Sequence, residues 1–343
     1  MSGNPGHLVV GPLRHGVVTF ALDLVAELTR VNHPARTVRV DDWTGLEDAL
    51  ARLEPAAGLH LNFTDRLFGA TPRAAGDRVA GIVTSVASAG GRVTATLHDV
   101  PQPADGGNYR ERVDAYRAVC NAVHGLATNS EHERSLLAES DIAGPADVVV
   151  VPLPLHLGEV RPARPVVGTR SVAVLGFVYP GKGHSEVLAA MSDLPRDVEF
   201  VAIGECSAGH ADLADRLAAS ARASGRRFAV TGYVPSDELT DAMHRVSAPV
   251  AHHRHVSASG SLNTWIAAHR RPLAPVNRYT LEHAERHPGT LRLYPDTDRG
   301  LEEAIASALD DPDSTWLTAD AASGSTPADA ARRYVEAFAR WHD

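Results

Sequence analysis

The sequence predicts an α/β protein built from two Rossmann-like domains that face each other across a cleft. Short apolar strands alternate with amphipathic helices along the chain, which is typical of a parallel sheet covered by helices. This alternation occurs once in each half, and a proline-rich segment with little periodicity, residues 152–165, separates the two series. We therefore expect domains at residues 1–158 and 166–326, followed by a last helix at residues 327–343.

In the N-terminal half, each expected strand is followed by a turn and then by a helix whose apolar residues recur every three or four positions. The sequence predicts strands at 7–10, 37–40, 58–63, 93–97 and 147–151, and helices at 17–28, 46–53, 73–88 and 109–120. Ser130, with Glu133 three residues later, predicts a capping box at the start of a further helix.

The C-terminal half repeats the pattern and is therefore also expected to be doubly wound. The sequence predicts strands at 171–175, 198–203, 228–231, 248–251 and 272–275, and helices at 185–191, 212–223, 236–245, from 262 onward, and around 301–309. Residues 325–327 are expected to cap the last helix, which carries its apolar residues on one face.

Composition narrows the class of function. With 343 residues, of which 44% are hydrophobic, the chain can bury a large core. The net charge of −9 argues against a nucleic-acid partner and favours a small-molecule substrate. Cys120 and Cys206 match no metal or redox spacing, so we expect both to be reduced, buried and structural. The sequence shows no export signal and no run long enough to span a membrane, which predicts a cytoplasmic protein without a transmembrane segment.

Two candidate sites lie in the N-terminal half. In the first, Arg14-His15-Gly16, the glycine lets backbone approach a ligand at a helix start; the alternative is an ordinary turn with two solvated side chains. In the second, His98 ends a buried strand and could hydrogen-bond substrate hydroxyls, with Asp99 orienting it; the alternative is a structural pair.

A third candidate is the loop at residues 176–183, where Lys182 can pair with a phosphate as a point charge. The loop is not a P-loop, because Gly183 stands where a serine or threonine is required after the lysine. Nucleoside-triphosphate chemistry is therefore not predicted.

The fourth candidate is the small-residue turn that joins the apolar stretch 248–251 to a helix. The unpaired N–H groups and dipole of a helix start form an anion site. We expect Ser259, Gly260, Ser261 and Leu262 to cradle a diphosphate and Arg254 to bind its oxygens; the alternative is a serine-rich cap beside a solvated arginine. Nearby histidines alternate faces of a strand, so no metal site is predicted: His252, His253 and His255.

Nearly the whole chain resembles the retaining glycosyltransferases of GT-B architecture in family 4 (glycosyl transferases group 1), which include sucrose synthase and bacterial mannosyl- and N-acetylglucosaminyltransferases. The resemblance rests on the order and spacing of six segments: RHGVVTFALDLVAEL, ATLHDV, LATNSEHERSLL, VAVLGFVYPGKGHSEVLAAM, VTGYVPSDELTDAMHRV and SASGSLNTWIAAHRRPL.

The resemblance assigns roles to individual residues. It implies that Gly16 approaches the donor phosphate or the acceptor, and that His98 lies near the transferred sugar. It also implies that Lys182 neutralises the diphosphate leaving group, which Ser259 to Leu262 cradle. Members of this family bind the nucleotide chiefly through the C-terminal domain, need no metal or other cofactor, and return their final helix to the N-terminal domain.

The chain departs from the family pattern at the acids. The family commonly carries two glutamates separated by seven residues, one near the transferred sugar and one on the nucleotide ribose. Counting back from Pro272 places Ser257 and Trp265 at these positions. The arginine that usually precedes the loop lysine is also absent, and Arg254 is the residue that can replace its charge. We therefore expect donor recognition to differ from the usual case.

These features predict a glycosyltransferase that acts with retention and without a metal. The donor is expected to be a UDP-, GDP- or dTDP-linked sugar, and the acceptor a small molecule, a glycan or a lipid. His98, Asp99 and Lys182 are its predicted catalytic residues. One alternative is a catalytically inactive relative that binds a nucleotide or a protein partner, which the missing glutamates favour. Another is a nucleotide-sugar epimerase, which requires acid–base pairs that the sequence does not offer.

Overall fold

The computed structural model describes residues 4–144, 147–157, 169–254, 256–318 and 320–342. The chain divides into two compact units, each with its own sheet. Unit 1 comprises Met1–Pro154 together with Ser325–Asp343, and unit 2 comprises Leu155–Gly324. The chain therefore passes between the units twice. The predicted linker, residues 152–165, lies outside the described residues from 158 onward.

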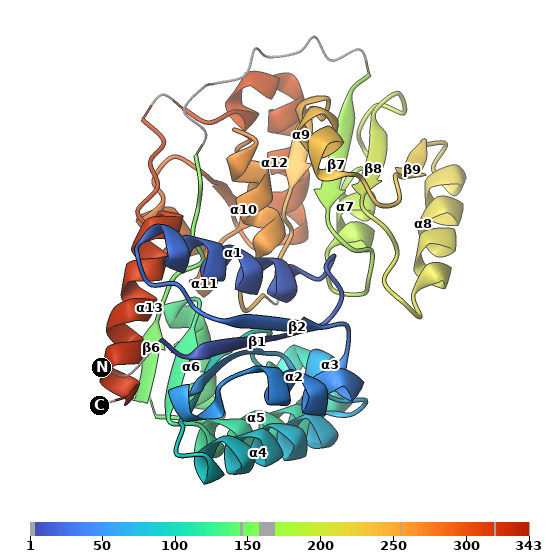
Figure 1. Ribbon diagram of the computed structural model, residues 1–343. Coiled ribbons are helices and arrows are strands. Elements are labelled where there is room, and N and C mark those ends of the chain that lie inside the picture. Colours follow the sequence, from blue (N-terminus) through green and yellow to red (C-terminus); the bar gives the residue numbers. More distant parts are fainter. Residues whose placement is uncertain (1–3, 145–146, 158–168, 255, 319, 343) are drawn as a thin grey trace. The chain divides into compact units, whose positions relative to one another are not determined.

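Within its described residues, unit 1 contains a parallel sheet of six strands in the order β2-β1-β3-β4-β5-β6 (Figure 1). Its strands are β1 (Gly6–Val10), β2 (Thr37–Val40), β3 (Leu59–Phe63), β4 (Val93–Leu97), β5 (Gly125–Thr128) and β6 (Val148–Val150). Its helices are α1 (Gly16–Arg30), α2 (Leu46–Arg52), α3 (Asp65–Phe68), α4 (Pro72–Ser88), α5 (Tyr109–Ala122), α6 (Glu131–Glu139) and α13 (Pro327–His342).

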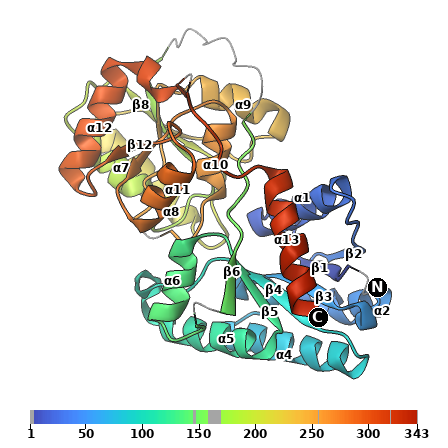
Figure 2. The same cartoon turned by 90° about the vertical axis from the view of Figure 1, so that its left-hand side faces the viewer.

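Helices cover both faces of the unit 1 sheet, with α1 and α13 on one face and α4 and α5 on the other (Figures 1 and 2). The face under α13 is polar, although it is buried. His60 in β3 bonds the hydroxyls of Thr94 and Thr96 in β4, at 2.9 and 3.0 Å, and the Thr96 hydroxyl lies 2.7 Å from the Tyr334 hydroxyl of α13. These pairs satisfy polar groups that burial would otherwise penalise.

The part of unit 2 that the structure describes also holds a six-stranded parallel sheet, in the order β12-β11-β10-β7-β8-β9. Its strands are β7 (Ser171–Leu175), β8 (Glu199–Ile203), β9 (Phe228–Val230), β10 (Ala248–Val250), β11 (Leu273–Pro275) and β12 (Arg292–Tyr294). Its helices are α7 (His184–Ala190), α8 (Ala211–Ala223), α9 (Ser236–His244), α10 (Gly260–Ala267), α11 (Arg278–Arg286) and α12 (Asp298–Asp310). Figure 2 shows α9 and α10 on one side of the strands and α7 and α12 on the other.

The predicted fold class is confirmed, because both sheets are parallel and doubly wound. Among the α-helices and strands of the described residues, α3, α11 and β12 were not predicted. Helix α11 buries Tyr279, Thr280 and His283, so its inner face carries no apolar stripe to signal a helix. Strand β12 has only three residues, which is too short for a periodic pattern.

Two smaller expectations concern the cap of α6 and the burial of the two cysteines. Ser130 caps α6, since its Oγ accepts from the Glu133 amide at 3.0 Å, while the Glu133 carboxylate accepts from the Asn129 amide at 2.6 Å. Both cysteines are free, but only Cys120 is buried; Cys206 is partly exposed, so the expectation that both are buried was wrong for Cys206. Across the described residues, no helix combines the length and apolar character that spanning a membrane requires.

Candidate functional site

The strand order of unit 1 reverses between β1 and β3, and open α/β sheets bind ligands at the carboxyl ends of the strands beside such a reversal. The loop after β1 leads to His15, whose Nδ1 accepts from the Val17 amide at 3.3 Å and so caps α1. Gly16, the first residue of α1, is exposed, and a Cβ added to it would meet no atom within 4 Å. The start of α1 therefore has an open surface within unit 1.

His98 follows β4 and is held between two amides. Its Nε2 lies 3.1 Å from Asn62 Oδ1, and its Nδ1 lies 3.2 Å from Asn129 Nδ2. Nε2 therefore carries the proton, and Nδ1 accepts. Burial, together with the neighbouring His15, lowers the pKa of His98 to about 3, so the ring is neutral at physiological pH. With both nitrogens bonded and a lowered pKa, the ring is poorly suited to proton transfer.

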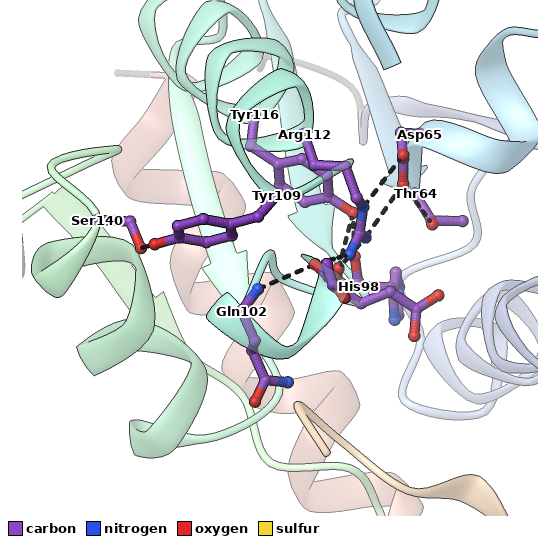
Figure 3. A network of polar contacts seen from close by, with 10 residues as sticks. Thr64, Asp65, His98, Gln102, Tyr109, Arg112, Tyr116 and Ser140 are labelled. Carbon is purple, nitrogen blue, oxygen red and sulfur yellow. Dashed lines mark hydrogen bonds and ion pairs between the residues drawn. The ribbon is translucent and has the colours of Figure 1, made fainter. Parts of the chain in front are cut away.

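Asp99 is exposed, and its backbone has a φ of +51°. A non-glycine residue in this left-handed region costs roughly 1 kcal/mol, and such residues persist where surrounding structure holds them. In this turn, Arg112 and Tyr116 of α5 hydrogen-bond the carbonyl groups of His98 and Asp99 (Figure 3). His98 and Asp99 therefore form a rigid turn at the carboxyl end of β4.

The strand order of unit 2 reverses between β7 and β10, and the third and fourth predicted sites meet there. Lys182, in the loop after β7, donates from Nζ to Ser261 Oγ in the first turn of α10 at 2.8 Å. Gly176, with a φ of +112°, makes room for this contact, because a Cβ added there would lie 3.2 Å from Lys182 Cε. The structure thus brings an ammonium group to the amino end of α10.

The sequence contains one lysine and 32 arginines, and Lys182 is that lysine. Arginine supplies the basic side chains elsewhere in this chain, whereas the compact ammonium group of Lys182 lies close to Gly176. This signal was present in the sequence and adds weight to Lys182 as a functional residue.

The serine turn is fixed from inside unit 2. Ser259 Oγ accepts from the Leu262 amide at 3.2 Å and lies 2.9 Å from Nε2 of the buried His253. The Ser259 amide donates to the Tyr279 hydroxyl at 3.0 Å. Gly260 is exposed, and no atom lies within 4 Å of a Cβ added to it. The amino end of α10 therefore presents Gly260, Ser261 and Lys182 together, on a turn that His253 and Tyr279 support.

Arg254 has other partners. Its guanidinium donates to Asp296 at 2.8 Å and to Asp298 at 2.9 Å, so two carboxylates already balance its charge. The prediction that Arg254 binds the diphosphate did not anticipate these carboxylates, which lie more than 40 residues away in sequence. Lys182 is the better cation for an anion at this turn.

Ser257 and Trp265, at the expected acid positions, are both buried. Trp265 is fully buried among apolar residues under the sheet, including Leu175, Ile203 and Met243. The position of the second expected acid is therefore a core position in this chain, and a ribose would need another partner.

No metal site is found in the described residues, which contain no group of three or more histidine, cysteine or acidic side chains able to hold an ion. His252 and His253 instead bond different partners, the Tyr294 hydroxyl at 2.5 Å and the Ser259 hydroxyl at 2.9 Å. His255 lies outside the described residues.

A hollow of about 730 Å³ lies elsewhere in unit 1, at the amino ends of β5 and β6. Arg117, Cys120, His124 and Asp147 are among its lining residues, and none of the predicted site residues lines it. Since open α/β sheets bind ligands at the opposite ends of their strands, the strand reversals are the better candidates for a functional site.

Comparison with solved structures identifies the fold. HepE from Anabaena, in complex with UDP and glucose, matches with a TM-score of 0.67 at 13% identity, over 98% of this chain and 95% of that one. Sucrose-phosphate synthase from Thermosynechococcus elongatus matches with a TM-score of 0.66 at 14% identity, over 98% and 95%. A glycosyltransferase from Rickettsia africae matches with a TM-score of 0.63 at 11% identity, over 99% of both chains.

These structural neighbours are glycosyltransferases of the GT-B fold, and the likeness extends over almost the full length of both chains. At identities of 11–14%, it shows the fold that this chain has. No protein-family model matches the sequence, and no curated protein matches it.

Proposed function

We propose that this protein is a glycosyltransferase that moves a sugar from a nucleoside diphosphate sugar to an acceptor hydroxyl. One observation carries the proposal: the 2.8 Å bond from Lys182 Nζ to Ser261 Oγ, which joins the loop after β7 to the amino end of α10. A diphosphate bound there would receive the Lys182 charge, the Ser261 hydroxyl and the N–H groups of Gly260 and Ser261 at the helix start.

Leaving-group stabilisation is the chemistry that this arrangement supplies. As the bond from the sugar to the diphosphate breaks, negative charge grows on the departing phosphate oxygens. A fixed ammonium and helix N–H groups that are already in place stabilise that charge without reorganising. We propose that Lys182 and the amino end of α10 do this work and that no metal is needed.

His98 and Asp99 are proposed to face the transferred sugar and the acceptor, with Gly16 leaving room for the ligand at the start of α1. The family resemblance supports retention of configuration, which proton NMR of the anomeric position in the product tests directly. UDP-linked sugars are the first donors to test, because HepE also has a solved complex with UDP-glucose; GDP- and dTDP-linked sugars follow.

The test is a panel of UDP-, GDP- and dTDP-linked sugars, incubated with the protein and with mixed glycan, lipid and small-molecule acceptors. Release of the free nucleoside diphosphate is measured, together with the melting temperature. We expect one nucleotide to raise the melting temperature and its sugar to be turned over. If no member of the panel is turned over and none raises the melting temperature, the proposal fails.

A second candidate is an inactive relative that binds a nucleotide or a protein partner. It is favoured by the burial of Trp265 and Ser257, which stand where two glutamates are usual in the resembled family. This candidate predicts that a nucleoside diphosphate raises the melting temperature while no sugar is transferred or hydrolysed. The same panel therefore separates the two candidates.

A further inference from the structure

The polar network behind the His98–Asp99 turn connects three segments of unit 1 through one guanidinium. Arg112 Nε and Nη2 donate to the two carboxylate oxygens of Asp65, each at 3.2 Å, and Nη1 donates to Asp105. Nη2 also donates to the Asp99 carbonyl. The Arg112 side chain is 11% exposed and that of Asp65 is 5% exposed, so solvent barely screens this pair. Figure 3 shows Arg112 reaching from α5 toward Asp65 and the turn.

Tyr116, one helical turn further along α5, holds the same turn. Its hydroxyl donates to the His98 carbonyl at 2.5 Å and lies 3.2 Å from the Asp99 carbonyl. The Tyr116 side chain is fully buried, and its ring packs edge-on against Phe63 with a centroid distance of 5.1 Å. The position of the hydroxyl is therefore set by the core of unit 1.

The turn has few other polar groups to offer a ligand. Side-chain donors occupy the carbonyls of His98 and Asp99, and amides occupy both ring nitrogens of His98. The Asp99 carboxylate is exposed, and its residue keeps a φ of +51° that an unsupported chain would avoid. The exposed Asp99 therefore keeps a carboxylate that can accept a hydrogen bond at the carboxyl end of β4.

We propose that Arg112 and Tyr116 are positioning residues that hold this turn so that the Asp99 carboxylate, and not the His98 ring, accepts a hydrogen bond from a substrate hydroxyl. The assignment of a sugar or acceptor hydroxyl as the partner rests on the proposed function. It deepens that function, because it makes a hydroxyl donor the group that unit 1 recognises.

Tyr116→Phe removes the clamping hydroxyl and keeps the ring, and Tyr109→Phe is the matched control. Tyr109 lies on the same helix, and its hydroxyl is 2.9 Å from Ser140 Oγ, so the control also removes one hydroxyl contact but not one to the turn (Figure 3). Hydrogen exchange measured by mass spectrometry reports on three backbone amides near the turn. The His98 amide donates to the Phe63 carbonyl, the Gln102 amide to the Asp105 carboxylate, and the Asp105 amide to the Gln102 carbonyl.

We expect these amides to exchange about tenfold faster, or more, in Tyr116→Phe and in Arg112→Lys, because an unpaired buried carbonyl destabilises the turn locally. In Tyr109→Phe they should exchange at the wild-type rate. If these amides exchange at the wild-type rate in both Tyr116→Phe and Arg112→Lys, the proposal that Arg112 and Tyr116 hold the turn is wrong, whether or not the protein transfers a sugar.

The second readout is turnover of the donor found in the nucleotide-sugar panel. Asp99→Asn and Tyr116→Phe should lower kcat at least about tenfold while the Kd for the nucleoside diphosphate, which unit 2 binds, stays unchanged. Tyr109→Phe should keep wild-type kcat. A wild-type kcat for Asp99→Asn overturns the role of its carboxylate. A wild-type protein that transfers no sugar overturns the proposed function and, with it, the role of Asp99. The positioning role of Arg112 and Tyr116 is tested separately, by hydrogen exchange alone.

Discussion

Lys182 and Ser261 stand 79 residues apart in sequence and meet through a 2.8 Å hydrogen bond at the strand reversal of unit 2. The contact places the chain's one lysine at the amino end of α10. Cation, hydroxyl and helix dipole are thus assembled before any ligand arrives, which is the property that makes electrostatic stabilisation effective.

Lys182→Ala should lower kcat for sugar transfer by about 10²–10³, the usual cost of removing one group that stabilises developing charge. Lys182→Arg should restore little of this activity, because Lys182 Cε lies where even a Cβ on Gly176 would approach within 3.2 Å. Steady-state kinetics of both variants check this. Full activity in Lys182→Arg would show that the charge matters and the shape does not.

Arg254→Gln should keep nucleotide binding and turnover close to wild type. The guanidinium is bonded to Asp296 and Asp298, and its side chain is 33% exposed, so we expect a loss of only about 0–1 kcal/mol in the free energy of unfolding. The Kd for the nucleoside diphosphate is the deciding measurement. A tenfold weaker Kd in this variant would return Arg254 to the donor site.

Because His7 is buried, we expect the folded protein to lose stability in mild acid. Burial lowers the pKa of His7 to about 4, from the 6.5 of an unperturbed histidine, and neither ring nitrogen has a hydrogen-bond partner among the described residues. Below pH 6.5 the unfolded chain binds a proton that the folded chain does not, so stability falls as the pH drops from about 6.5 to about 4. The full effect of this one residue is on the order of 3 kcal/mol.

His7→Phe should therefore make the decline of the free energy of unfolding over this pH window less steep, while other buried histidines with a lowered pKa, such as His184, keep their contributions. The change places an aromatic ring beside His60 and Phe338, which already contact His7. The wild-type protein is the reference for the slope. Urea unfolding at several pH values measures both; equal slopes for His7→Phe and wild type would contradict the assignment.

Arg270→Met should destabilise unit 2 by about 3 kcal/mol or more, because it leaves several buried acceptors unpaired. The fully buried guanidinium donates to the carbonyls of Met243 and Val246 at 2.8 and 2.7 Å and to the Thr315 hydroxyl at 2.7 Å. Arg245→Met, at an exposed position nearby in sequence, is the control. A urea midpoint shared by both variants would refute this role.

The sequence was sufficient for the two sheets, because strands such as β7 are apolar runs followed by a turn and a helix. It also singled out Lys182 and the serine turn as two separate candidates, since each pattern is local, but not the contact between them. Helix α11 escaped prediction because the face that it buries is made of Tyr279, Thr280 and His283.

Contacts between distant segments could not be predicted from one sequence. Arg112 and Asp65 are 47 residues apart, and nothing in either local pattern indicates their pairing. The same holds for Arg254, whose partners Asp296 and Asp298 follow 42 and 44 residues later. In the sequence, an arginine beside a helix start suggests an anion site. In the structure, two carboxylates of the same chain already pair with this arginine.

Because Lys182 is the chain's one lysine, the central claim can be tested at a single atom. Reductive methylation with ¹³C-formaldehyde labels its Nζ and the α-amino group, so the NMR spectrum contains one lysine signal. We predict that the nucleoside diphosphate selected by the panel shifts this signal and raises the pKa of the labelled amine, while the matching nucleoside does neither. An unchanged Lys182 signal at saturating nucleoside diphosphate, with binding verified by calorimetry, would contradict the assignment of the diphosphate site.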